Sequence, residues 1–209
     1  MERWLCDYDS TLANTDGARY DAVNAKFGTS YRAEDVIDWY WTQHNWPKEH
    51  NDWMWGPECF LSEEFQLSVS PQPNAVETLL SMRENGIEPM IVSDRPVELF
   101  DCTREWLDEH GLDMIRLLFT RHKHSLNMVT KGVPTKQQAA VLYRLRTVLE
   151  DAPHHALAFA EKDHIDQVYL FDRPYNQGIE HEKILRLTDW NHLDTLVTIM
   201  SLTGVLGGR

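Results

Sequence analysis

Cysteine is scarce in this sequence, and the few cysteines are not arranged in pairs. There are three, Cys6, Cys59 and Cys102, an odd number with no C-x-x-C motif. This pattern argues against a disulfide-stabilised protein and predicts a reducing, cytoplasmic setting.

Long apolar runs are also missing. No segment approaches the roughly 20 apolar residues that a membrane-spanning helix needs. The opening "MERWLC" leads straight into a predicted strand, without room for a signal peptide. We therefore expect a soluble protein with no membrane partner.

Basic residues are outnumbered by acidic ones. The sequence has 20 Lys and Arg against 33 Asp and Glu, which gives a formal net charge of -13. Proteins that hold long nucleic acids neutralise successive phosphates with Lys and Arg. The composition therefore argues against a long nucleic-acid partner and favours a small-molecule site.

Internal repeats and low-complexity linkers are absent, so we expect the 209 residues to form one core with an insertion. After about residue 69, helical and strand patterns alternate, which is typical of an α/β protein whose parallel sheet is covered by helices on both faces. The predicted strands are residues 2–6, 87–93, 114–119, 146–149 and 167–171. The predicted helices are a segment ended by Gly86, residues 96–109, residues 135–145, and a helix that opens at Pro153 with Ala152 as its cap.

Polar side chains follow the predicted strands, at the point where each strand ends. Asp7 and Asp9 follow the first strand, Ser93 ends the second, and Glu150 and Asp151 follow the strand "RTVL". The carboxyl ends of parallel strands meet at one edge, where ligands bind. Several carboxylates at one edge repel each other unless a cation lies among them. Oxygen ligands of this kind predict a hard divalent ion, Mg²⁺.

These residues resemble the motifs of the haloacid dehalogenase-like (HAD) phosphatases. The first motif reads "DYDST", Asp7 to Thr11; the second is Ser93 in "MIVSD"; the third is Lys136 in "VPTKQQA"; the fourth is the acid pair in "VLEDAPHHA". The order of the motifs is that of the family. The stretch "YLFDRPYNQ" and the helical insertion resemble its 5'-nucleotidase, deoxyribonucleotidase-like branch.

The resemblance implies a Rossmann-like core with a small helical cap inserted after the first strand. We place the core at residues 1–13 and 69–209 and the cap at residues 14–68. It also implies that Asp7 is the nucleophile, forming an aspartyl-phosphate, and that Asp9 is the general acid and base.

The remaining roles are implied in the same way. The metal would be held by Asp7, the Asp9 backbone carbonyl and the acids Glu150 and Asp151, with the direct acid ligand left open. The phosphoryl group would be bound by Ser93 and Lys136, and also by Asp94 and Arg95. Two alternatives stay open, since Lys131 or Lys123 could replace Lys136 and Arg95 could simply lie on the surface.

The predicted cap is unusually rich in tryptophan. Aromatic faces stack on nucleobases, so some of these side chains would contact a base; otherwise they supply a small core. The candidates for substrate contact are Trp39, Trp41, Trp53 and Trp55.

Together these observations predict a Mg²⁺-dependent phosphatase of nucleoside 5'-monophosphates. Two alternatives remain at this level: a phosphatase of a sugar phosphate or of a polynucleotide 3'-phosphate, and a non-catalytic protein that binds a nucleotide or another partner.

Overall fold

A six-stranded, fully parallel sheet forms the centre of the computed structural model, which describes residues 2–37, 39, 55–121 and 132–205. The strand order is β3-β2-β1-β4-β5-β6. The bounds are β1 Glu2–Cys6, β2 Ile87–Ser93, β3 Arg116–Phe119, β4 Thr147–Glu150, β5 Gln167–Phe171 and β6 Ile184–Leu187. The predicted α/β class with a parallel sheet is confirmed.

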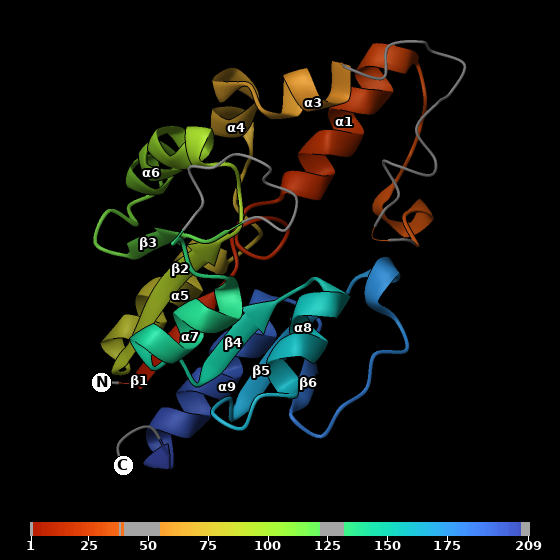
Figure 1. The fold of residues 1–209 in the computed structure, drawn as a ribbon. Coiled ribbons are helices and arrows are strands. Elements are labelled where there is room, and N and C mark those ends of the chain that lie inside the picture. The colour runs from red at the N-terminus through yellow and green to blue at the C-terminus, as the bar shows by residue number, and fades with distance from the viewer. Residues whose placement is uncertain (1, 38, 40–54, 122–131, 206–209) are drawn as a thin grey trace.

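Helices cover both faces of the sheet (Figure 1). In chain order the α-helices are α1 Thr15–Phe27, α3 Trp55–Phe60, α4 Glu63–Ser68, α5 Ala75–Glu84, α6 Phe100–Glu109, α7 Lys136–Tyr143, α8 Pro153–Ala160 and α9 Trp190–Leu202. Short 3-10 turns are η1 Ala33–Asp35, η2 Val97–Leu99 and η4 Pro174–Asn176. Helices α5 and α9 pack together on one face, and α7 and α8 lie on the other. No helix within the described ranges has both the length and the apolar character needed to span a membrane.

The core is divided by the central strand β1, because successive side chains of a strand point to opposite faces. Trp4 and Cys6 join the cluster under α5 and α9, whereas Leu5 joins the cluster under α7 and α8. All three side chains are fully buried. Trp4 also stacks on Tyr169 of β5, with 5.4 Å between ring centroids. A strand held from both faces fixes the position of the residue that follows it.

Most predicted elements are present, with shifted ends. The expected helix over residues 96–109 begins at Phe100, after Pro96 and the turn η2. The helix predicted over residues 135–145 ends at Tyr143, because Arg144 takes a left-handed conformation with φ of 57°. As predicted, Ala152 is the N-cap residue of α8. Strand β6 and helix α9 have no counterpart among the predicted elements.

The segment between β1 and α5 leaves the sheet and returns to it at adjacent points. The Asn14 amide donates to the Ser70 carbonyl at 2.8 Å, and the Gln72 amide donates to the Leu12 carbonyl at 2.8 Å. Between these points, α1, α3 and α4 lie beyond the carboxyl ends of the strands (Figure 1). Helix α4 packs on α6, so the segment is joined to the rest of the core. The cap boundary at residues 14 and 68 stays a prediction.

Candidate active site

The site lies where the strand order changes direction. The chain adds β2 and β3 on one side of β1, then crosses to build β4, β5 and β6 on the other. In open parallel sheets this switch point is where ligands bind. Asp7 is the first residue after β1, and its amide donates to the Leu149 carbonyl of β4 at 3.0 Å. The neighbouring strand therefore fixes Asp7 at this edge.

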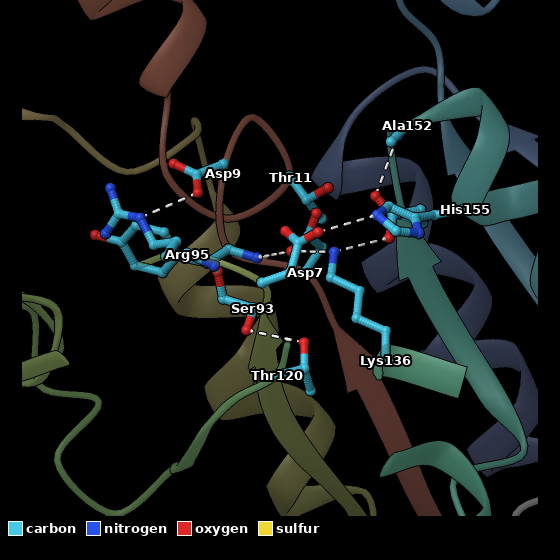
Figure 2. A network of polar contacts seen from close by, with 12 residues as sticks. Asp7, Asp9, Thr11, Ser93, Arg95, Thr120, Lys136, Ala152 and His155 are labelled. Carbon is cyan, nitrogen blue, oxygen red and sulfur yellow. Dashed lines mark hydrogen bonds and ion pairs between the residues drawn. The ribbon is translucent and has the colours of Figure 1, made fainter. Parts of the chain in front are cut away.

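Lys136 reaches the same point from the first residue of α7. Thr135 caps this helix, since its hydroxyl accepts from the Gln138 amide at 3.2 Å. The Lys136 Nζ lies 2.8 Å from Asp7 Oδ1 and 3.2 Å from Glu150 Oε2 (Figure 2). Burial alone lowers the pKa of Lys136, but the two carboxylates outweigh it and hold the pKa well above its usual value. The ammonium is therefore charged.

Two further acids are fully buried beside Asp7. Glu150 Oε1 accepts from the backbone amides of Asp151 at 3.2 Å and Ala152 at 3.1 Å. Asp151 accepts from the Thr11 hydroxyl at 2.7 Å and from the Tyr175 hydroxyl at 2.5 Å. Both side chains thus have fixed orientations.

The electrostatics of this cluster favour a cation. Burial, with a contribution from the Glu150 charge, raises the pKa of Asp7 despite the opposing effect of Lys136. Burial also raises the pKa of Glu150, and burial with the charges of Asp7 and Asp16 raises the pKa of Asp151 to about 7. One ammonium offsets only one of three carboxylates, so the negative forms are disfavoured without further positive charge.

The donor set fits a hard divalent ion. Ligand atoms of Asp7, Glu150 and Asp151 all lie within 4.8 Å of one another, and the described part of the chain contains this one group of metal-ligating side chains. Carboxylate oxygens are ligands that Mg²⁺ accepts.

The remaining predicted core residues lie around this cluster. Ser93, at the end of β2, is buried, and its hydroxyl accepts from the Arg95 amide at 3.3 Å. Asp94 is part-exposed, with an oxygen 3.4 Å from His155 Nε2. Arg95 pairs with Asp9, Nε to Oδ2, at 3.0 Å. The alternative that Arg95 lies on the surface was wrong, because this residue is only 6% exposed.

Of the four candidate tryptophans, Trp39 lies beside the site. Its ring meets the rings of Tyr175 and His154 edge-on, with centroids 5.1 Å and 5.4 Å apart. Trp41, Trp53 and the side chain of Trp55 lie outside the described residues, as do Lys123 and Lys131.

Three side chains that the sequence patterns did not single out hold Asp151 in place. Thr11 belongs to the quoted first motif, but was given no role. Tyr175 also contacts Asp16 at 3.1 Å, and Asn176 Nδ2 donates to the backbone carbonyls of Asp151 and Phe171, each at 2.8 Å. The only sequence signal for the last two was their place in "YLFDRPYNQ", after a predicted strand.

A parallel sheet with an aspartate after its central strand, a buried lysine and an acid pair on the next strand defines a HAD-type hydrolase. Solved structures share this fold. A HAD family hydrolase from Deinococcus radiodurans R1, with bound phosphate and sodium, aligns over 100% of this chain and 99% of its own, with a TM-score of 0.62 and 15% identity. A haloacid dehalogenase-like hydrolase from Streptococcus pneumoniae aligns over 95% of this chain and 98% of its own, with a TM-score of 0.60 and 10% identity.

The sequence comparison narrows the class to a family. The chain belongs to the family described as "5' nucleotidase, deoxy (Pyrimidine), cytosolic type C protein", whose sequence model matches residues 4–202. It is similar to the "Putative nucleotidase YqfW" of Bacillus subtilis, with 26% identity over 91% of this chain and 90% of the relative. A "Putative nucleotidase" of Bacillus cereus is 28% identical over 71% of each chain. The protein is thus a phosphatase of the HAD superfamily, and the predicted resemblance is confirmed.

Proposed function

We propose that this protein is a Mg²⁺-dependent phosphatase of nucleoside 5'-monophosphates that acts through an aspartyl-phosphate. The observation that carries this proposal is the position of Asp7 at the switch point of the sheet, 2.8 Å from the Lys136 ammonium and grouped with two buried acids. A small phosphate ester is the substrate that the family membership implies.

The chemistry proceeds in two steps at Asp7. A carboxylate oxygen of Asp7 attacks phosphorus, the bond from phosphorus to the ester oxygen breaks, and Asp9 gives that oxygen its proton. Asp9 then takes a proton from water, whose oxygen attacks phosphorus. The bond to Asp7 breaks, inorganic phosphate leaves, and the free carboxylate is restored.

Lys136 and Ser93 bind the phosphoryl oxygens. Lys136 supplies positive charge, and Ser93 a hydroxyl from the end of the neighbouring strand. Asp94 is a poor phosphate ligand by charge, since a carboxylate repels a phosphate. Its contact with His155 favours a role in orienting the His155 ring.

Asp7, the Asp9 carbonyl and the acid pair would hold Mg²⁺. When bound, the ion would offset the repulsion between a carboxylate nucleophile and a phosphate dianion. Asp151 is the better direct ligand of the pair. Lys136 and two backbone amides already engage Glu150, whereas Asp151 receives side-chain hydrogen bonds only from neutral hydroxyls.

Three observations favour a mononucleotide as substrate. The matching family and both relatives carry nucleotidase in their descriptions, and the family description names deoxy and pyrimidine compounds. Trp39 contacts Tyr175, which itself contacts Asp151, so an aromatic ring of the predicted cap lies near the acid pair. The net charge of -13 disfavours a polynucleotide. The family description also supports a cytoplasmic location.

The test is phosphate release from a panel of esters with Mg²⁺ and with EDTA. The panel contains ribo- and deoxyribonucleoside 5'-monophosphates, sugar phosphates and an oligonucleotide 3'-phosphate. We expect Mg²⁺-dependent turnover that is fastest on a deoxyribonucleotide. Turnover confined to sugar phosphates would remove the nucleotide part of the proposal, and inertness toward every ester would remove all of it.

A further inference from the structure

Arg95 is an arginine whose charged group is occupied inside the protein. It follows β2, and its side chain is 4% exposed. Its Nε lies 3.0 Å from Asp9 Oδ2, its Nη1 donates to Thr103 Oγ1 at 2.7 Å, and its Nη2 donates to Gln66 Oε1. The guanidinium carbon lies 4.4 Å from the centroid of the Tyr8 ring. All three nitrogens therefore have protein partners, and burial keeps the guanidinium largely out of contact with solvent.

Asp9 is held from two sides by this arrangement. Its Oδ1 accepts from the Thr15 hydroxyl at the start of α1 at 2.8 Å, and its Oδ2 faces Arg95. Its side chain nevertheless remains 28% exposed. In Figure 2, Asp9 and Arg95 lie to the left of Asp7, and Lys136 lies to its right. The carboxylate thus has a fixed direction and an accessible face.

The contacts of Arg95 extend away from Asp9 into the segment inserted between β1 and α5. Gln66, in α4, donates from its Nε2 to the Phe60 carbonyl, which leaves Oε1 to accept from Arg95. Gln66 is itself buried. A continuous chain of contacts therefore connects the inserted helices, through Arg95, to Asp9.

We propose that Arg95 is a positioning residue that aims Asp9 at the leaving-group oxygen, with Gln66 holding Arg95 in place. The proposal rests on the function proposed above, in which Asp9 donates its proton to the departing ester oxygen as the bond to phosphorus breaks. It replaces the phosphate-binding role that the sequence predicted for Arg95, because the buried guanidinium already has its partners.

The test compares two leaving groups. A nucleoside 5'-monophosphate releases an alkoxide that needs a proton, whereas p-nitrophenyl phosphate releases a phenolate that leaves without one. We expect Arg95→Met to lower kcat/KM on the nucleotide by about 10- to 100-fold, and on the aryl ester by about 3-fold or less. The comparison uses kcat/KM because this constant reports the step in which the leaving group departs, and not the later attack of water, which Asp9 assists for both esters. Gln66→Leu should show the same pattern with a smaller loss, and Arg95→Lys should recover part of it.

A double-mutant cycle with Asp9→Asn separates positioning from direct binding. If Arg95 acts through Asp9, Arg95→Met causes no further loss in the Asp9→Asn protein. The control is Arg104→Met in α6, which removes an arginine that binds the carbonyls of Ile115 and Leu112. This control should leave the ratio of the two activities unchanged.

Three results would overturn the proposal: equal losses of kcat/KM on both esters, losses that add in the double mutant, or an altered ratio in Arg104→Met. Equal and additive losses would assign Arg95 to phosphate binding or to folding. If the Arg95→Met protein does not fold, the two esters are compared in the Gln66→Leu and Arg95→Lys proteins instead. A wild-type protein inert toward both esters would instead refute the proposed function.

Discussion

The substitution Lys136→Met removes the positive charge beside the three buried carboxylates and keeps a side chain of similar length. Lys136 is 3% exposed and contacts both Asp7 and Glu150. Removing one partner of a buried ion pair costs about 3–5 kcal/mol, because the other charges stay buried and unpaired. At about 2–4 °C per kcal/mol for a chain of this size, Tm should fall by roughly 6–20 °C in EDTA.

Mg²⁺ should reverse part of this loss. A ligand at 100 times its Kd stabilises the folded state by about 2.7 kcal/mol. Without the ammonium, the three carboxylates carry more uncompensated charge, so Mg²⁺ should raise Tm more in the variant than in the wild type. Turnover should still fall by about 100- to 1000-fold, because a group that stabilises charge on the phosphoryl oxygens is lost.

The assay is thermal unfolding followed by circular dichroism, in EDTA and across a Mg²⁺ titration, together with phosphate release. Lys183→Met is the matched control, since Lys183 is part-exposed and its ammonium donates to the Lys162 carbonyl at 2.8 Å. A Lys136→Met protein as stable as the control in EDTA, with no extra gain from Mg²⁺, would refute the idea that the acids repel each other across a shared metal site.

Three other predictions concern single side chains. Asp7→Asn should abolish detectable turnover while Tm in EDTA stays the same or rises, since one of the repelling buried carboxylates becomes neutral; substantial residual turnover would contradict a covalent role for Asp7. Tyr175→Phe should weaken Mg²⁺ binding about 10- to 100-fold in a titration of activity, because Asp151 loses a hydrogen-bond donor, whereas the control Tyr143→Phe should not. Trp39→Ala should raise KM for nucleotides by about 5- to 150-fold, the equivalent of about 1–3 kcal/mol of base stacking, and leave KM for p-nitrophenyl phosphate near its wild-type value; equal changes for both would place Trp39 in the fold rather than in recognition.

The segment inserted between β1 and α5 shows how much of the structure the sequence patterns could predict. The sequence indicated a helical, tryptophan-rich segment after the first strand, and α1, α3 and α4 lie there. Its composition could not say which aromatic rings approach the site, because that depends on how the segment folds back over the sheet. The structure places Trp39 against Tyr175, a residue 136 positions later in the sequence.

Interactions between residues close in the sequence determine most strands and helices of the core. Apolar strands, helix stops and the proline at position 153 act over a few residues, so the sequence alone predicted the parallel sheet, the Ala152 cap and the strand ends that carry Asp7, Ser93 and the acid pair. Only the tertiary structure decided how the side chains at those ends pair, because pairing depends on contacts that no short pattern encodes. Thr11 meets Asp151 across 140 positions, and Gln66 meets Arg95 across 29. Arg95 could have been a surface residue or a phosphate ligand by its sequence context; its burial between the inserted helices and Asp9 is a property of the folded chain.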